Sequence, residues 1–245
     1  MSEPPSSGWD DSAHAWIASL GDDGDFGRRF VLDVPMIERI RGRSFGRALD
    51  VGCGEGRFCR MMQALGISTV GADPTRALID RARLLDPLGD YRIGRAENLD
   101  VPAESFDLAV CYLSLIDIDD LAGAASDISR ALKPGGTLLI ANLTSFNTAG
   151  LPAGWTRDAD GELRFTIDRY LEARRILSEW HGIRVHNWHR PLSDYFSVFL
   201  DRGFVLTHFA EPEPTGGDRE RAELYRRIPW FHIIEWEKSL GAVVS

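Results

Sequence analysis

The sequence predicts an α/β protein built on a doubly wound parallel sheet. An apolar strand, a glycine-rich turn and a helix follow one another within residues 47–65. Segments of strand and helix character then alternate up to residue 142, which is typical of a parallel sheet with helices on both faces. The chain has 245 residues, 44% of them apolar, and no linker-like boundary, so we expect a single domain over residues 1–245.

Each element of this alternation follows from a local pattern. Apolar residues recur at helical spacing from Trp9 to Leu20 and again from Phe30 to Ile40, which predicts a helix over each segment. Gly203 is placed to end the last long helix. The elements expected after residue 40 are strand 47–51, helix 56–65, strand 69–72, helix 75–84, strands 91–94 and 106–111, helix 121–132, strand 136–142, a helix from Pro191 to Asp201, and strands 205–209 and 231–236.

Two segments lie outside the alternation and are rich in aromatic residues. We expect residues of about 9–30 to form an N-terminal lid, and an insertion of about 144–190 to form a substrate cap. Both can reach the carboxyl ends of the strands, where a doubly wound sheet binds its ligands. Buried core is the alternative explanation for such rings. The rings expected over the substrate are Trp16, Trp155, Tyr170, Trp180 and Trp188.

The turn after the first strand has the composition of a cofactor-binding loop. Glycines at positions 52, 54 and 56 allow a sharp turn and a close approach of the backbone to a ligand. The amide groups at the start of the next helix face the same place. A dinucleotide-binding loop would carry its third glycine at position 57, which is Arg57. The loop therefore indicates a nucleotide-like cofactor of another kind.

Four segments in order resemble the motifs of class I S-adenosylmethionine-dependent methyltransferases, in particular the bacterial small-molecule branch. They span residues 47–143, and the segment 189–195 adds to the likeness. The resemblance implies a seven-stranded Rossmann-like sheet of order 3-2-1-4-5-7-6, whose last two strands are antiparallel. The segments are Asp50-Val51-Gly52-Cys53-Gly54-Glu55-Gly56, Gly71-Ala72-Asp73-Pro74-Thr75, Ser105-Phe106-Asp107-Leu108-Ala109-Val110 and Arg130-Ala131-Leu132-Lys133-Pro134-Gly135-Gly136-Thr137-Leu138.

The resemblance also implies which residues bind S-adenosylmethionine. Asp50 would organise the loop and the methionine end of the cofactor, and Asp73 would accept hydrogen bonds from the ribose hydroxyls. A helix cap is the alternative role for Asp73. On the adenine side, Arg95 departs from the family pattern, so Glu97 is either an adenine contact or a surface acid. The expected cofactor-binding residues are Asp50, Gly52, Cys53, Gly54, Asp73, Pro74, Ala96, Glu97 and Cys111.

A histidine could serve as a general base if the methyl acceptor carries a proton. His189, just before the turn at Arg190-Pro191, is the first candidate, although a hydrogen-bonded structural histidine is the commoner case. His181, His186 and His189 lack the spacing and the neighbouring ligands of a metal site. We therefore expect no metal.

Charge and hydropathy exclude some partners. The chain carries 37 acidic and 28 basic side chains, a net charge of −9, which disfavours nucleic acid as a partner. No apolar run approaches the roughly 20 residues that cross a bilayer, and residues 1–7 do not resemble a secretory signal. We expect a cytoplasmic protein that does not bind membranes; the oligomeric state stays open.

These observations predict an enzyme that transfers a methyl group from S-adenosylmethionine to a small organic acceptor. Oxygen, nitrogen and carbon all remain open as the accepting atom. One alternative is an NAD-dependent oxidoreductase, which the absent third glycine and the turn Lys133-Pro134-Gly135-Gly136 oppose. The other is a non-catalytic protein of the same fold that binds the cofactor.

Overall fold

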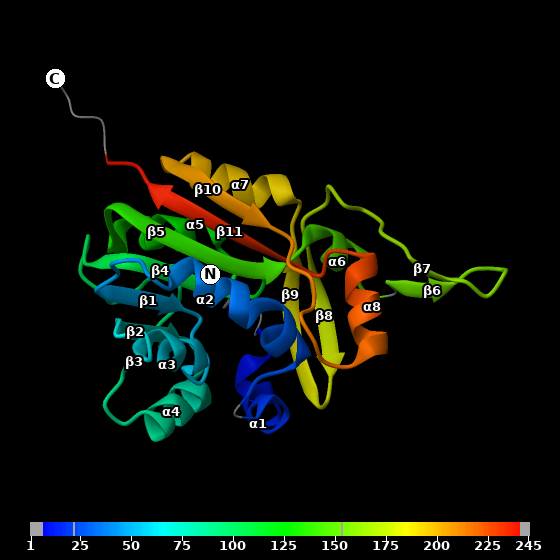
Figure 1. The fold of residues 1–245 in the computed structure, drawn as a ribbon, viewed down its shortest axis with the longest axis horizontal. Coiled ribbons are helices and arrows are strands. Elements are labelled where there is room, and N and C mark those ends of the chain that lie inside the picture. Colours follow the sequence, from blue (N-terminus) through cyan, green and yellow to red (C-terminus); the bar gives the residue numbers. More distant parts are fainter. Residues whose placement is uncertain (1–6, 22, 153, 241–245) are drawn as a thin grey trace, which may run out of the picture.

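A seven-stranded sheet forms the centre of the molecule (Figure 1). The computed structural model describes residues 7–21, 23–152 and 154–240. The sheet order is β3-β2-β1-β4-β5-β11-β10, and the strands pair in parallel except for β11 and β10. Counted within this sheet alone, the order is 3-2-1-4-5-7-6, as predicted. The strands are β1 (Arg47–Val51), β2 (Ser68–Asp73), β3 (Asp90–Ile93), β4 (Phe106–Tyr112), β5 (Leu132–Leu143), β10 (Phe204–Ala210) and β11 (Phe231–Lys238).

Helices cover both faces of the sheet. On one face, Phe199 and its neighbours pack with Leu49, Phe106 and Trp236 of the strands. Because both faces are covered, the central strands are apolar throughout rather than alternating. The helices of this first face are α5 (Leu121–Ala131) and α7 (Leu192–Leu200); the second face holds α2 (Asp33–Ile40), α3 (Arg57–Gln63) and α8 (Arg219–Arg227), with α4 (Arg76–Leu85) against β2 and β3.

The predicted elements are present, with two differences in helices. The helix expected from residue 30 begins instead as a short π-helical turn, η1 (Arg28–Leu32), and continues as α2. Helix α8 was not predicted, because its low hydrophobicity and four arginines resemble an exposed loop. Its start does carry a local signal: the Asp218 side chain accepts a hydrogen bond from the Arg221 N–H at 2.9 Å.

The insertion consists of one short helix and two β-hairpins. Helix α6 (Ser145–Gly150) is followed by hairpin β6 (Trp155–Arg157) with β7 (Leu163–Phe165), and by hairpin β8 (Arg174–Trp180) with β9 (Ile183–His189). In Figure 1 the first hairpin projects away from the sheet, whereas β9 lies beside helix α1 (Trp9–Leu20).

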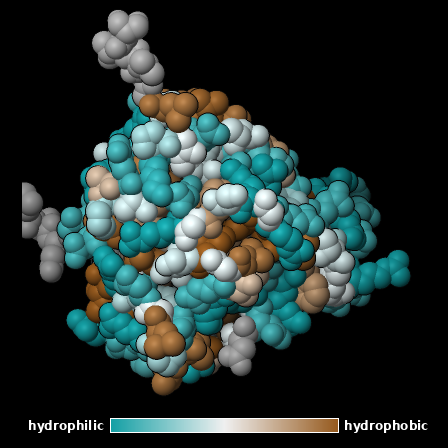
Figure 2. All heavy atoms as spheres, turned by 60° about the vertical axis from the view of Figure 1, so that its left-hand side comes forward, coloured by the Kyte–Doolittle hydropathy of each residue, from teal (hydrophilic) through white to brown (hydrophobic). Residues whose placement is uncertain are grey.

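The surface is largely hydrophilic on the face shown in Figure 2, with hydrophobic residues in separate patches. None of the helices within the described ranges is long and apolar enough to cross a membrane. Parts of the predicted domain lie outside the described residues. These are residues 1–6 and 241–245 at its ends, Asp22 within the predicted lid and Ala153 within the predicted cap.

Candidate active site

A cavity of about 550 Å³ lies at the carboxyl ends of β1, β2 and β4. This is the end of the sheet where doubly wound folds bind ligands, and the volume is in the range of small-molecule sites. Its walls come from α1, η1, the glycine loop, the ends of β2 and β3, and the loop after β4. The wall residues from the predicted cofactor set are Asp50, Gly52, Cys53, Gly54, Asp73, Pro74, Ala96 and Glu97.

The glycine loop borders the cavity through two residues whose backbone is in the left-handed region that favours glycine. Gly52 has φ of 76°, and a Cβ there would lie 2.3 Å from the Cβ of Ser114. Gly54 has φ of 55°, and a Cβ there would meet no atom within 4 Å among the described residues. Gly52 therefore allows close packing against the loop after β4, while Gly54 leaves its side of the cavity open.

Asp73 is both a cap and a cavity residue. Its Oδ1 accepts a hydrogen bond from the Thr75 N–H at 2.8 Å, and its Oδ2 accepts one from the Gly54 N–H at 3.0 Å. Burial raises the pKa of this carboxyl, and the two N–H donors oppose the shift. The two alternatives for Asp73 are thus compatible, because a carboxylate has lone pairs left for further donors.

Asp50 is an incompletely paired carboxyl at the base of the cavity. Its Oδ2 accepts a hydrogen bond from the Cys59 thiol at 3.3 Å, while its Oδ1 is buried without a partner in the described part of the chain. Burial raises the pKa of Asp50 to about 7, and the nearby Asp73 and Glu55 carboxylates add to the shift. A buried carboxylate needs a donor or cation. The methionine ammonium group of S-adenosylmethionine fits this need.

The segment after β3, which was expected to face the adenine, forms part of the cavity wall. Ala96 and Glu97 line the cavity together with Arg95. Arg95 Nε donates a hydrogen bond to Glu97 Oε1 at 2.8 Å, so the residue that departs from the family pattern is also the one that holds Glu97. Glu97 therefore lines the cavity as part of an ion pair.

Cys111 lies behind the cavity rather than on its wall. Its side chain is fully buried, and the lining residues begin one position later, at Tyr112, Leu113 and Ser114. Cys111 packs instead in the core between the sheet and helices α5 and α7. The expectation that Cys111 contacts the cofactor is therefore wrong for this cavity, because side chains alternate along β4 between the two packed faces of the sheet, and Cys111 points to the face of α5 and α7.

His189 also lies outside the cavity. It is fully buried, its Nε2 lies 2.8 Å from the Tyr170 carbonyl oxygen, and its Nδ1 lies 2.8 Å from Thr148 Oγ1. A carbonyl only accepts, so Nε2 carries the proton and Nδ1 accepts from Thr148. Burial lowers the pKa of the ring. The prediction of His189 as the general base is corrected: the ring joins α6, β9 and the Tyr170 segment.

The predicted cap does not line the cavity either. The lining residues all lie between Ser7 and Asp119, so Trp155, Tyr170, Trp180 and Trp188 contribute none of the wall. Hairpin β8–β9 supports the loop after β4 from outside. The Trp188 N–H donates to the Ile116 carbonyl at 2.6 Å, and the Trp188 indole donates to Asp119 at 2.7 Å.

The N-terminal segment, in contrast, covers the cavity. Trp9, Trp16 and Leu20 of α1 line it, and the rings of Trp9 and Trp16 meet edge to face with centroids 5.3 Å apart. Of the five rings expected over the substrate, only Trp16 lies on the wall. The position of α1 supports the N-terminal lid, which remains a proposal.

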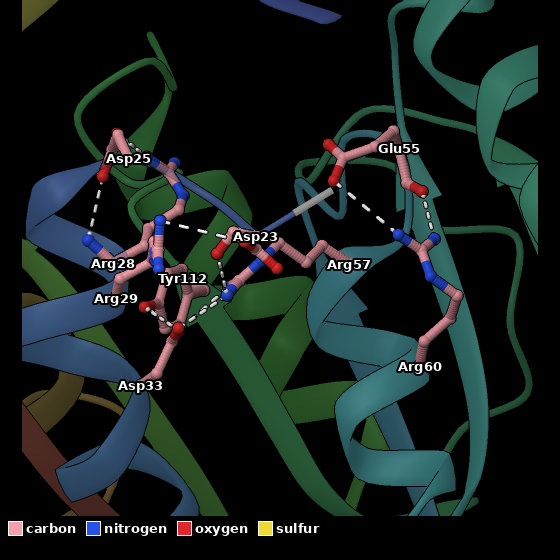
Figure 3. Close-up of polar contacts among 9 residues, drawn as sticks. All are labelled: Asp23, Asp25, Arg28, Arg29, Asp33, Glu55, Arg57, Arg60 and Tyr112. Atoms are coloured by element: carbon pink, nitrogen blue, oxygen red, sulfur yellow. Dashed lines mark hydrogen bonds and ion pairs between the residues drawn. The ribbon is translucent and has the colours of Figure 1, made fainter. Parts of the chain in front are cut away.

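A network of charged side chains fixes this segment to the loop (Figure 3). Arg57 donates to both Asp33 oxygens, at 2.9 and 2.6 Å, and to the Asp23 carbonyl at 2.7 Å. The Tyr112 hydroxyl donates to Asp33 at 2.8 Å. Arg57, which replaces the third glycine of a dinucleotide-binding loop, therefore ties the N-terminal segment to α3 and β4.

Sequence reasoning missed several charged residues of the wall, among them Arg28 and Asp117. Arg28 donates to Asp25 at 2.6 Å and lies 4.8 Å from the centre of the Trp16 ring. Asp117 follows β4 by five residues and accepts a hydrogen bond from Asn187 at 2.6 Å. The available signal for Asp117 was its position just beyond the carboxyl end of a central strand, where functional side chains gather.

The structure reveals no metal site in the described ranges. No group of three or more histidine, cysteine, aspartate or glutamate side chains there is arranged to hold an ion. His186 lies on β9 with His189, and His181 lies in the turn between β8 and β9. The absence of a metal remains a prediction.

Comparison with known proteins agrees with this geometry. Residues 49–140 match the family model described as "Methyltransferase domain". The chain is 34% identical over 195 residues to a "Ubiquinone biosynthesis O-methyltransferase" of Bradyrhizobium sp. (strain ORS 278), covering 71% of this chain and 73% of that protein. It is 31% identical over 138 residues to a "Malonyl-[acyl-carrier protein] O-methyltransferase" of Yersinia pestis, covering 56% of this chain and about half, 51%, of that protein's length.

A solved structure supports the same relationship. The S-adenosylmethionine-dependent methyltransferase from Mesorhizobium loti superposes with a TM-score of 0.75 and 28% sequence identity, covering 89% of this chain and all of that one. The sheet order, the glycine loop and these similarities agree with one another. The chain belongs to the class I S-adenosylmethionine-dependent methyltransferases.

Proposed function

We propose that this methyltransferase methylates an oxygen atom of a small organic acceptor bound between α1 and the loop 113–119. The observation that carries the proposal is that the cavity extends beyond the residues suited to the cofactor. Asp50, Gly54 and Asp73 gather on its glycine-loop side, whereas Trp16 and Asp117 line it from α1 and from the loop after β4. A wall of aromatic rings with a few polar groups is typical of a small-molecule site.

The relatives support oxygen as the accepting atom. The Bradyrhizobium and Yersinia proteins are both described as O-methyltransferases, with different acceptors. Neither relative therefore identifies the acceptor of this chain, but both support oxygen as the accepting atom.

The residues of the cavity fit S-adenosylmethionine and suggest how the chain uses it. When bound, S-adenosylmethionine supplies a methyl group on a positively charged sulfur. Asp73 would accept hydrogen bonds from the ribose hydroxyls, Asp50 would pair with the amino group, and Ala96 with Glu97 would face the adenine. Trp9 and Trp16 would exclude water above them. Positioning in a dry site accounts for much of the acceleration that such a displacement needs.

The class of acceptor and the cellular location are also part of this proposal. The net charge of −9 supports an acceptor other than nucleic acid, because few basic groups are left to displace counterions. The absence of a spanning helix among the described residues is compatible with a cytoplasmic location. Membership in the methyltransferase family disfavours the NAD-dependent alternative.

The test is transfer of labelled methyl groups to a bacterial metabolite extract. The full chain is incubated with S-[methyl-³H]adenosylmethionine and the extract, and products are separated by chromatography. We expect a small organic product whose label is attached through oxygen. Alkali releases the label from a methyl ester but not from an ether, which separates carboxyl from hydroxyl acceptors.

The control is Asp73→Ala, which should weaken binding of S-adenosylhomocysteine by about tenfold or more, the scale of a lost charge-assisted hydrogen bond. Label that appears only in nucleic acid, or no label at all with intact S-adenosylhomocysteine binding, would contradict the proposed function. The second result would favour the non-catalytic alternative.

A further inference from the structure

Asp117 is a carboxyl group on the cavity wall that no part of cofactor binding requires. We propose that Asp117 is the general base that removes the proton from a phenolic hydroxyl of the acceptor, with Asn187 as its positioning residue. This inference rests on the proposed function and deepens it, since it names the chemical class of the acceptor.

The backbone holds Asp117 in place at the cavity. The Asp117 N–H donates to the Ser114 carbonyl at 3.0 Å, which closes a turn directly after β4. On either side of it, the Ile116 carbonyl accepts from the Trp188 N–H at 2.6 Å, and the Ile118 carbonyl accepts from Arg190 at 2.6 Å. The loop is therefore fixed from the side of β9, which suits a residue that must meet a reacting atom.

The side chain is oriented by one amide and leaves room for a further donor. Asn187 Nδ2 donates to Asp117 Oδ1 at 2.6 Å, and Asn187 is itself buried on β9. A carboxylate offers about four lone-pair positions on two oxygens. Even with the Trp9 side chain as a second donor, Asp117 retains acceptor capacity on the cavity side.

The electrostatic surroundings make this carboxyl a stronger base than an ordinary aspartate. Burial raises the pKa of Asp117 to about 7, and the charge on Asp73 adds to the shift. The donors Trp9 and Asn187 and the charge on Arg28 oppose it. A base with a pKa near the working pH is the most effective. The charged or titratable groups around Asp117 are Asp10 of α1, Arg28 of η1, Asp73 of β2, Asp119 of its own loop, Arg190 after β9 and Tyr195 of α7.

Six other carboxyl groups of the described residues line the cavity. Glu97 is paired with Arg95, and Asp10 and Glu55 lie on α1 and in the glycine loop. Asp73 accepts from two backbone N–H groups, Asp50 lies at the glycine loop, and Asp119 accepts from the Trp188 indole. Asp117 combines a place in the loop after β4, acceptor capacity beyond its donors Asn187 and Trp9, and a raised pKa.

The basicity of Asp117 and the aromatic rings of the cavity wall together favour a phenol as the acceptor. A phenol has an ordinary pKa of about 10, which is much closer to the pKa of Asp117, about 7, than the pKa of an aliphatic alcohol is. Asp117 can therefore remove a phenolic proton far more readily than an alcoholic one. Flat aromatic molecules also suit a wall that contains Trp9, Trp16 and Tyr112. A carboxylate acceptor would need no base at all, so Asp117 favours a phenol over an acid.

The proposed step is balanced in atoms and electrons. The acceptor oxygen loses its proton to Asp117 and forms a bond to the methyl carbon. The bond from that carbon to sulfur breaks, and its electron pair stays on sulfur. The products are an aryl methyl ether, S-adenosylhomocysteine and a protonated Asp117, which releases the proton to water when the site opens.

The experiment compares Asp117→Asn with wild type in the extract assay and in a measurement that needs no turnover. At pH 7 we expect at least a 100-fold lower rate of alkali-stable label, with S-adenosylhomocysteine affinity within threefold of wild type by calorimetry. In infrared difference spectra of wild type minus Asp117→Asn, the protonated carboxyl band should titrate near pH 7. Asn187→Ala should move that midpoint upward, because it removes a donor to the charged form.

The matched control is Asp120→Asn, the same change three residues away. Asp120 caps α5 through a hydrogen bond from the Gly123 N–H at 2.8 Å, and asparagine caps equally well. Wild-type turnover in Asp117→Asn, or a carboxyl band that titrates near pH 4, would overturn the proposal while leaving the proposed function intact. A wild-type protein that labels only alkali-labile products would overturn the phenolic acceptor alone, and one that labels nothing contradicts the proposed function itself.

Discussion

The N-terminal segment of residues 9–30 and the insertion of residues 144–190 share a high aromatic content but lie in different places relative to the cavity. Both are rich in aromatic residues and lie outside the α/β alternation. The first lines the cavity through Trp9, Trp16 and Arg28, while the second contributes no lining residue. Aromatic composition therefore does not tell which surface the rings of a segment face.

The difference has a physical cause in how each segment satisfies its own polar groups. The insertion pairs its backbone within two hairpins and closes His189 between Thr148 and Tyr170. The N-terminal segment is held instead by other elements: Arg57 beside the glycine loop donates to the Asp23 carbonyl (Figure 3), and Ser12 exchanges hydrogen bonds with the backbone of Arg184 on β9. One region covers the cavity and the other supports the loop beside it.

The largest expected effect is that of deleting residues 1–25. Turnover should fall at least 100-fold, because water would reach the site and the acceptor would lose its aromatic wall. The sheet should remain folded, since none of the three core clusters contains a residue before Phe26. Labelled methyl transfer and circular dichroism measure the two effects. The matched change in the insertion is replacement of residues 155–165 by a short glycine-serine loop, and a comparable loss of turnover there would break the comparison.

The second prediction concerns Asp50 of β1, which lines the cavity but belongs to neither of the two regions. Asp50→Asn should weaken S-adenosylhomocysteine binding by about tenfold or more, because it removes the charge that pairs with the amino group. It should also raise the melting temperature at pH 8 by about 2–8 °C.

The sign of that stability change follows from the raised pKa of Asp50. The carboxyl titrates at about 7 in the folded protein against an ordinary value of 3.8. Its favourable protonation is fully present below pH 4 and is lost as the pH rises through 7, so the buried charge destabilises the fold above pH 7. The gain of Asp50→Asn should therefore vanish near pH 4. An equal gain at both pH values would contradict the raised pKa.

A pair of arginines, one from each region, gives the third prediction. Arg28→Ala should weaken binding of S-adenosylhomocysteine or of the acceptor by about tenfold, since Arg28 is the cation beside Trp16 on the wall. Arg174→Ala should leave binding unchanged and lower the melting temperature, because Arg174 donates to the Ala149 and Arg169 carbonyls within the insertion. Calorimetric titration and thermal melts distinguish them. Weaker binding in Arg174→Ala together with unchanged binding in Arg28→Ala would contradict the comparison.

The smallest effect on activity is expected for His189→Gln. Loss of the hydrogen bonds to Thr148 and Tyr170 should reduce the free energy of unfolding by about 1–3 kcal/mol, while turnover and its pH dependence stay as in wild type. Denaturant titration measures the first quantity, and initial rates between pH 5 and 9 measure the second. A 100-fold slower variant of unchanged stability would restore His189 as a catalytic residue.

Local sequence determined most of the fold and the cofactor side of the cavity. The glycine loop, Asp50, Asp73 and the segment with Ala96 could be located in advance, because each lies at or just beyond the carboxyl end of a parallel strand, and these ends meet at one edge of the sheet. These positions depend on hydrogen bonds between neighbours along the chain and on the period of apolar residues. Helix α8 was missed because it has few apolar residues and four arginines, so its sequence resembles an exposed loop.

Only the tertiary structure decided which side chains line the cavity beyond the glycine loop. Cys111 and Tyr112 are adjacent in sequence, yet they pack on opposite faces of the sheet, and only Tyr112 also lines the cavity. His189 and Asn187 lie two residues apart on β9; one closes a buried contact with Thr148 while the other reaches Asp117. Contacts across 41 and 70 residues of chain carry no local pattern. Tertiary packing therefore decides which of these residues line the cavity and which only support the fold.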